Sequence, residues 1–140
     1  MSQPNLKITG NYLQPITLPL IFLVVKAEGL YKKSFFSKPD PFAVVTIDGD
    51  QTHTTLPDHS TLDPFWNNLC RFVVFESSVV AVQVFDQKRF KKDGQGFLGV
   101  ANFIVSSVIA LNQGPRQSNP EGNLILLFIF RIFDIAIATK

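Results

Sequence analysis

The chain has 140 residues, of which 46% are hydrophobic and 14 are phenylalanine, so it is long enough for one domain with a buried core. Charged residues make up 17%, which excludes a disordered chain, and the formal net charge of +2 by itself implies no partner. The single cysteine, Cys70, excludes an internal disulfide and suits a reducing compartment. Cys70 lies in an apolar run, where we expect a small buried side chain rather than a catalytic thiol.

The first 19 residues predict an irregular segment. They contain a short alternation at Leu6–Thr9, and Pro15 and Pro19 disfavour both a helix and a central strand. Leu20–Val25 is a continuous apolar run that predicts a buried strand extending to Lys26. A signal peptide is the alternative, although no basic segment precedes the run and no small-residue cleavage site follows it.

Short apolar runs separated by turn signals fill the middle of the chain. Asp48-Gly49-Asp50 between two of these runs predicts a tight hairpin turn. Gln51–Leu56 alternates threonines with polar residues, as an edge strand does, and Pro57–Asn67 is predicted to be a loop. The other predicted strands in this region are Phe42–Ile47, Leu69–Phe75, Val79–Phe85 and Phe97–Val105.

The C-terminal third begins with Ser106–Leu111, which predicts a single helical turn with a serine cap. Asn112–Asn123 is rich in Gly, Pro, Asn and Ser and predicts a loop. Leu124–Ala138 is apolar except for Arg131 and Asp134. The segment is too short for a helix that spans a membrane, so we predict a closing strand.

Together these segments predict an all-β fold, an eight-stranded antiparallel β-sandwich with one short helical turn near 106–111. We expect residues 20–133 to form the domain, 1–19 to be an irregular N-terminal segment and 134–140 to be a C-terminal tail.

Two segments, Gly29–Phe42 and Val84–Gly99, hold seven of the 13 basic residues, so a mild net charge conceals a strong local one. If both lie at one end of the sandwich, their lysines and phenylalanines form a surface suited to an anionic membrane. The alternative for Phe35 or Phe36 is to fold back into the core. The candidate lipid-binding residues are Lys32, Lys33, Phe35, Phe36, Lys38, Lys88, Arg89, Phe90, Lys91 and Lys92.

Several motifs, in their order along the chain, resemble a C2 domain. They are Lys38-Pro39-Asp40-Pro41-Phe42, Leu62-Asp63-Pro64-Phe65-Trp66-Asn67, and Val84-Phe85-Asp86 leading to Gly96-Phe97-Leu98-Gly99. Three further stretches are similar to the N-terminal C2 domain of fungal HECT-type ubiquitin ligases: Gly29–Lys33, Asp48–Thr55 and Phe85–Lys92. The resemblance covers about Val24 to Val105; Gly10–Leu23 departs from the family pattern as an insertion, and Leu124–Lys140 matches the last strand loosely.

The resemblance implies a C2-like sandwich that acts as a non-catalytic membrane-targeting module for acidic phospholipids or phosphoinositides. It implies a cytoplasmic location, peripheral at the plasma or endosomal membrane. Implied protein partners are a HECT catalytic lobe, ubiquitination substrates or adaptors. Because the chain shows neither WW modules nor a HECT lobe, we expect no transfer of ubiquitin by it. The alternative function is a protein–protein interaction module that docks on a catalytic lobe and restrains it.

Calcium-binding C2 domains use about five aspartates from two loops, since calcium takes six to eight oxygens. Asp40, Asp86 and Asp93 match such positions, whereas Ser34 and Lys88 stand where the family pattern has carboxylates. An ammonium removes oxygens and adds positive charge. We therefore expect a degenerate calcium site, no cofactor and calcium-independent lipid binding, with weak calcium-dependent binding as the alternative. Equally, Asp40 and Asp86 could serve as turn residues that accept backbone N–H bonds.

Other candidate sites have weaker support. The basic and aromatic residues could follow phosphates, but no RNA-binding motif is present, so we expect no nucleic-acid partner. His53 and His59 have no cysteine nearby and predict solvated or hydrogen-bonded side chains rather than a metal pair. Trp66 predicts an anchor at one end of the sandwich. The sequence has no phosphate-binding loop, nucleophile elbow or zincin motif.

Overall fold

A computed structural model describes residues 6–9, 12–31, 36–90, 96–111 and 124–131. The described strands are β1 (Leu6–Thr9), β2 (Tyr12–Pro15), β3 (Leu18–Glu28), β4 (Pro41–Ile47), β5 (Gln51–Thr54), β6 (Phe65–Val74), β7 (Val79–Asp86), β8 (Phe97–Ile104) and β9 (Leu124–Arg131). The described helices are α1 (Gln87–Phe90) and α2 (Val105–Leu111). None of the described helices is long and apolar enough to cross a membrane.

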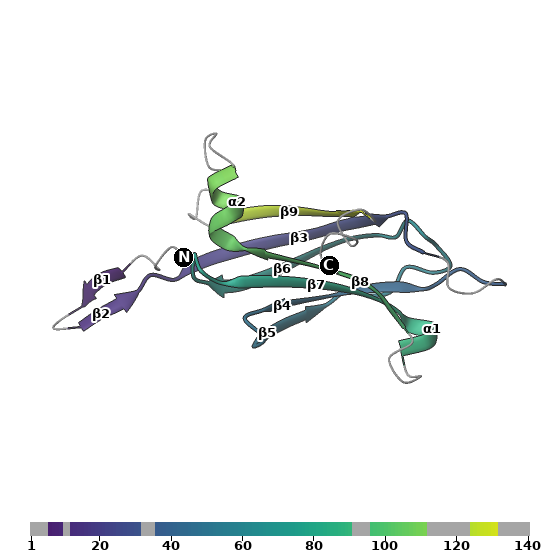
Figure 1. Cartoon of the computed structure of the whole chain (residues 1–140), viewed down its shortest axis with the longest axis horizontal. Coiled ribbons are helices and arrows are strands. Elements are labelled where there is room, and N and C mark those ends of the chain that lie inside the picture. The colour runs from purple at the N-terminus through teal and green to yellow at the C-terminus, as the bar shows by residue number, and fades with distance from the viewer. Residues whose placement is uncertain (1–5, 10–11, 32–35, 91–95, 112–123, 132–140) are drawn as a thin grey trace.

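Two facing layers of strands form a β-sandwich, as predicted (Figure 1). One layer has the order β6-β3-β9 and the other has the order β5-β4-β7-β8. Antiparallel pairing dominates, but β3 and β9 run parallel, from Leu20 opposite Leu124 to Glu28 opposite Arg131. Parallel neighbours need a long connection, and nearly the whole domain lies between these two strands. The described residues therefore place seven strands in the sandwich.

The N-terminal segment differs from its predicted irregular form, because β1 and β2 pair as a small separate hairpin. β3 begins at Leu18, two residues before the predicted strand, and includes Pro19. Pro19 lies opposite Val73 of β6, while the pairing of β3 with β9 starts only at Leu20. The proline therefore has one strand neighbour, as at a sheet edge, and its missing N–H breaks no ladder with β9. The domain boundaries at 19/20 and 133/134 stay predictions.

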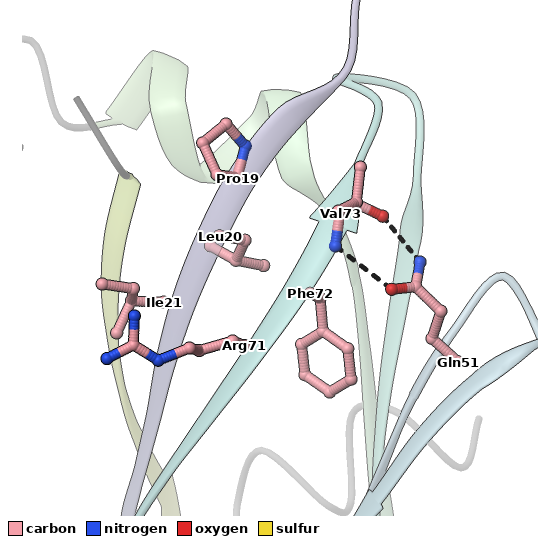
Figure 2. Close-up of a pocket in the computed structure, with 7 residues that line it drawn as sticks. All are labelled: Pro19, Leu20, Ile21, Gln51, Arg71, Phe72 and Val73. Carbon is pink, nitrogen blue, oxygen red and sulfur yellow. Dashed lines mark hydrogen bonds between the residues drawn. The ribbon is translucent and has the colours of Figure 1, made fainter. Parts of the chain in front are cut away.

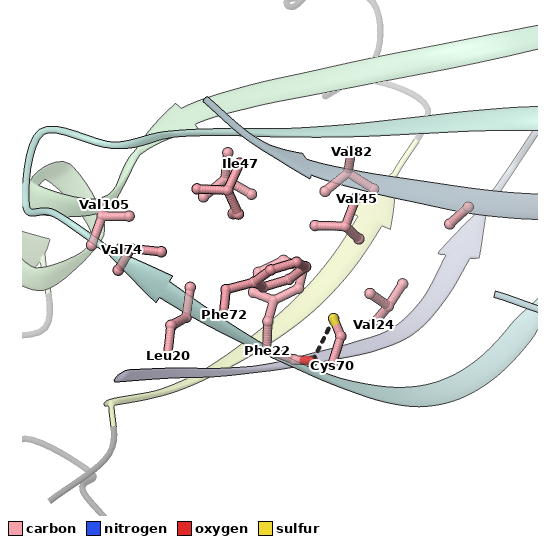
Figure 3. Packing of buried hydrophobic residues seen from close by; sticks show 12 residues of the cluster. Leu20, Phe22, Val24, Val45, Ile47, Cys70, Phe72, Val74, Val82 and Val105 are labelled. Atoms are coloured by element: carbon pink, nitrogen blue, oxygen red, sulfur yellow. Dashed lines mark hydrogen bonds between the residues drawn. The ribbon is translucent and has the colours of Figure 1, made fainter. Parts of the chain in front are cut away.

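The core lies between the two layers, where β7 and the second half of β6 bury every second side chain (Figure 3). The phenyl ring of Phe22 lies at its centre and contacts the ring of Phe103, with 6.1 Å between the centroids. The buried cluster consists of Leu20, Phe22, Val24, Ala43, Val45, Ile47, Cys70, Phe72, Val74, Val80, Val82 and Val105.

Several predicted elements are confirmed with shifted limits. The turn after β4 has positive φ at Asp48 (53°) and Gly49 (72°), as a tight hairpin requires, and β5 is an edge strand. α2 confirms the helical turn. β6 starts at Phe65, so the predicted loop Pro57–Asn67 ends earlier than expected. Asn67, with φ of 46°, lies beside a register shift between β3 and β6 that interrupts regular alternation.

The sequence prediction missed one helix, and part of it concerns residues that the structure does not describe. α1 was not predicted from the sequence. The predicted loop Asn112–Asn123 lies outside the described residues, and so does the end of the predicted strand Leu124–Ala138 beyond Arg131.

Cys70 is a buried core residue, as predicted, with 3% of its surface exposed. Its Sγ donates a hydrogen bond to the carbonyl oxygen of Phe22 at 3.2 Å. Burial raises the pKa of the Cys70 thiol to about 12.

We expect Cys70 to resist thiol reagents in the folded protein at neutral pH. A pKa of about 12 leaves roughly a thousandfold less thiolate than the ordinary value of 9.0. Labelling with a chromogenic disulfide reagent should be negligible in buffer and complete in denaturant. Fast labelling without denaturant would contradict the buried placement.

Candidate functional site

Three connections between strands meet at one end of the sandwich, where α1 lies (Figure 1). We call them the first loop (29–40, between β3 and β4), the middle loop (55–64, between β5 and β6) and the third loop (87–96, between β7 and β8, including α1). The first and third loops correspond to the two basic segments of the sequence. The middle loop was not predicted to take part.

Backbone hydrogen bonds fasten the middle loop to the first. The N–H of Leu30 donates to the carbonyl oxygen of Leu62, and the N–H of Thr61 donates to that of Pro39, both at 3.0 Å. The N–H of Gly29, where φ is 68°, donates to Oδ1 of Asp63 at 2.8 Å. The middle loop therefore supports the first along its described length.

Asp86 and Asp40 link all three loops through backbone N–H groups. Oδ1 of Asp86 accepts the N–H of Asp40 at 2.9 Å and the N–H of Lys88 at 3.0 Å, and Asp86 is 6% exposed. Oδ1 of Asp40 accepts the N–H of Ser60 in the middle loop at 2.8 Å. The interpretation of both aspartates as turn residues is confirmed.

The side-chain amine of Lys88 points back into the loop end. Nζ of Lys88 donates to the carbonyl oxygen of Lys38 at 2.9 Å and lies 3.5 Å from Oδ1 of Asp40. Lys88 stands where the family pattern has a carboxylate, so an ammonium faces two oxygens of the first loop.

The charge of Asp40 is stabilised by this arrangement. Burial alone raises the pKa of Asp40, but the hydrogen bond from Ser60, the charge of Lys88 and a contact with His59 together lower the pKa below its usual value. Nδ1 of His59 lies 3.7 Å from Oδ2 of Asp40, and the imidazole is 78% exposed.

The two described aspartates of the loop end, Asp40 and Asp86, are engaged by backbone N–H groups and by an ammonium. Among the residues that the structure describes, no group of three or more His, Cys, Asp or Glu side chains could hold a metal. Asp93, the third predicted ligand, lies outside the described residues. His53 is hydrogen-bonded to Asn68 through Nε2 at 2.5 Å, apart from His59.

Aromatic side chains mark the outer surface of the loop end. Phe36 is 92% exposed and Tyr31 is 66% exposed, so Phe36 does not fold back into the core. Phe90 is 50% exposed, and one side of its ring packs edge-on against Phe42 and Phe85, at centroid distances of 5.3 and 5.2 Å. Phe90 is thus a half-buried cap on an aromatic cluster.

The predicted basic residues are placed only in part. Lys38 is exposed, Arg89 is half-buried, and Lys88 makes the internal contacts above. The structure describes no position for the other five candidates, whose roles stay predictions: Lys32, Lys33, Phe35, Lys91 and Lys92.

Sequence reasoning missed the middle loop because it carries no cluster of like charges. A usable signal was its three closely spaced turn residues, Asp58, Ser60 and Asp63. Oδ2 of Asp58 accepts the N–H of Phe65 at 3.0 Å, which starts β6. Trp66 is an anchor, as predicted, since its Nε1 donates to the carbonyl oxygen of Pro41 at 3.0 Å.

Gly96 closes the third loop against the end of β7. Its carbonyl oxygen accepts the N–H of Asp86 at 2.7 Å. A Cβ at Gly96 would lie 2.9 Å from the carbonyl oxygen of Asp86 and from the backbone of Phe90. A glycine is therefore needed for α1 to pack this closely on β7.

A hollow of about 280 Å³ lies away from the loop end, beside the start of β3 (Figure 2). The amide of Gln51 closes one side of it by exchanging two hydrogen bonds with the backbone of Val73, at 2.6 and 3.1 Å. Only one lining side chain, that of Arg71, is charged, so the hollow has no group of residues suited to catalysis. Its lining residues are Pro19, Leu20, Ile21, Gln51, Arg71, Phe72 and Val73.

Comparison with known proteins gives a consistent result. A family model described as "C2 domain" matches residues 19–120. The chain is 47% identical over 113 residues, 81% of its length, to the probable E3 ubiquitin-protein ligase hulA of Aspergillus flavus. It is 55% identical over 91 residues, 65% of its length, to the E3 ubiquitin-protein ligase pub1 of Schizosaccharomyces pombe. The chain spans 12% of the length of each of these two relatives.

Solved structures agree with the fold. A C2 domain of plant Extended Synaptotagmin 1 matches with a TM-score of 0.54 and 26% identity over 66% of this chain and 72% of that one. A C2 domain of RIM from Drosophila matches with a TM-score of 0.55 and 21% identity over 64% of this chain and 77% of that one.

Replacing Gly96 with alanine should destabilise the domain by about 1–3 kcal/mol, because the added methyl group overlaps backbone atoms. Denaturant unfolding followed by circular dichroism measures this free energy. The control is Ser77→Ala, because Ser77 is exposed in the turn between β6 and β7. A Gly96→Ala variant as stable as the control would contradict the close packing of α1.

Acid should remove the stabilisation that Asp40 provides. Folding lowers the pKa of Asp40. The ionised Asp40 therefore contributes to the free energy of unfolding above its unfolded pKa of about 3.9, and this contribution is lost as pH falls through the lower folded pKa. The melting temperature of Asp40→Asn should be below that of the unmodified chain at neutral pH, and the difference should shrink below about pH 4. Asp50→Asn, in the exposed turn at the other end, is the control. A difference that stays constant with pH would contradict this role.

Proposed function

This chain belongs to the C2 domain family, and on that premise we propose that it is a membrane-targeting module that binds acidic phospholipids, including phosphoinositides, through its three-loop end. Since its relatives are named E3 ubiquitin ligases, the proposal includes recruitment of such a ligase to a membrane. The location proposed is the cytoplasmic side of the plasma or endosomal membrane.

The observation that carries this proposal is the position of exposed apolar and basic side chains on loops that are fastened together. Phe36 and Lys38 are exposed on the first loop, and half of Phe90 is exposed on the third. The Asp40–Asp86 hydrogen bond joins the two loops across 46 positions of sequence. Phenylalanine inserts at the headgroup boundary, and each lysine near an anionic surface contributes about 1 kcal/mol.

We also propose that lipid binding is independent of calcium. The contacts of the described aspartates support this proposal, because Asp40 and Asp86 accept backbone N–H groups and the Lys88 ammonium lies beside Asp40. The exposed Lys38 would interact with the anionic headgroups directly, an attraction that weakens as salt is raised.

Exposed apolar side chains on β6 support a second candidate function, binding to another protein. The outer face of β6 exposes three large apolar side chains, Phe65 (60%), Leu69 (48%) and Val73 (57%), with Asn67 and Arg71 between them. Such a face suits a protein surface, so docking on a HECT lobe, a substrate or an adaptor is the alternative proposal.

Vesicle sedimentation should show binding to vesicles that contain phosphatidylserine or phosphoinositides and none to neutral vesicles, with or without a calcium chelator. Lys38→Glu should weaken binding about thirtyfold, because it changes the charge near the membrane by two units at about 1 kcal/mol each. Arg71→Glu, an equal reversal on the outer face of β6, is the matched control and should change binding little.

For the apolar contribution, Phe36→Ala should weaken binding and Val73→Ala should not. No binding to any acidic vesicle would end the membrane proposal. Capture of a HECT lobe that is lost on Leu69→Ala would favour the alternative.

A further inference from the structure

We infer that the Lys88 ammonium holds the third loop against the first by binding two oxygens of the first loop, so that no metal ion is needed to join them. Its functional consequence rests on the proposed function: the lipid-binding end would be ordered without calcium. Lys88 would then be a positioning residue rather than a direct lipid ligand.

The ligands of the ammonium support this inference. The carbonyl oxygen of Lys38 accepts a hydrogen bond from Nζ at 2.9 Å, and Oδ1 of Asp40 lies at 3.5 Å. A main-chain oxygen and a carboxylate oxygen from one loop are also the kinds of oxygen that a hard metal cation takes. An ammonium offers three donors and no acceptor, so it can satisfy such oxygens directly.

The backbone of α1 fixes the position from which the Lys88 side chain extends. Oδ1 of Asp86 accepts the N–H of Lys88 at 3.0 Å, as a cap does at the start of a helix. The same oxygen accepts the N–H of Asp40, and Gly96 holds α1 close to β7. The main-chain N–H of Lys88 is therefore bonded to Asp86, while its side-chain amine lies beside Asp40.

The low exposure of Asp40 also favours a cation beside it. The Asp40 side chain is 15% exposed and Asp86 is 6% exposed, and poorly solvated carboxylates need a partner. His59 is charged only when it is protonated, and it is mostly exposed. Arg89, the neighbouring cation, makes no ion pair with any residue that the structure describes. A divalent ion beside Lys88 would meet repulsion in addition to the missing oxygens.

The test compares Lys88→Met with Arg89→Gln in this chain, since both remove one positive charge from α1. Hydrogen exchange by NMR reports on the N–H of Ser60 and of Asp40, which bond the two carboxylates. Lys88→Met should speed exchange at both about two- to fivefold, as expected for loss of a partly exposed ion pair, and Arg89→Gln should not. Lys88→Arg, which keeps the charge, should restore much of the protection.

Lipid binding supplies the second readout. On vesicles of phosphatidylcholine and phosphatidylserine, Lys88→Met should weaken binding more than Arg89→Gln, and millimolar calcium should leave binding of the unmodified chain unchanged. Unchanged exchange in Lys88→Met, or calcium that strengthens binding or protects the Ser60 N–H, would overturn the inference. If the unmodified chain binds no vesicle, the proposed function fails, while the exchange comparison still decides the role of Lys88.

Discussion

A single buried carboxylate, that of Asp86 at the end of β7, determines how the loop end is built. It accepts the N–H of Asp40 from the first loop and that of Lys88 from α1. Asp40 in turn accepts the N–H of Ser60 from the middle loop and faces the amine of Lys88. Two carboxylates and one ammonium thus connect segments far apart in sequence. Because the aspartates are used in this way, the exposed Phe36 and Lys38 lie on a supported surface.

The strands of the sandwich could be predicted because they are apolar, β-branched runs between turn residues. In β7, for example, Val80, Val82 and Val84 are fully buried, and the valine-rich run after the turn residues Ser77 and Ser78 was enough to predict a strand. The Asp-Gly turn was equally readable, since few residues adopt positive φ at low cost. The parallel pairing of β3 with β9 could not be read, because the choice of a distant partner depends on the assembled layers and not on any local pattern.

The candidate site was predictable in its residue types and not in its contacts. The sequence placed a lysine where a carboxylate was expected, and it offered a turn role for Asp40 and Asp86. It could not show that Lys88 reaches a carbonyl oxygen 50 positions away, or that Ser60 completes the link. The packing of Phe90 on Phe42 and Phe85 was also hidden, because a phenylalanine between lysines looks the same whether it is exposed or half-buried.

The most direct test of the membrane proposal asks which end of the sandwich meets the lipid. A polarity-sensitive fluorophore can be attached to Ser37→Cys in the first loop or to Ser77→Cys in the turn between β6 and β7 at the opposite end; both positions are exposed, and Cys70 is buried. With vesicles containing phosphatidylserine and a calcium chelator, the label at position 37 should shift to the blue and the label at 77 should not. A shift at 77 alone, or a shift at 37 only when calcium is added, would contradict the proposal.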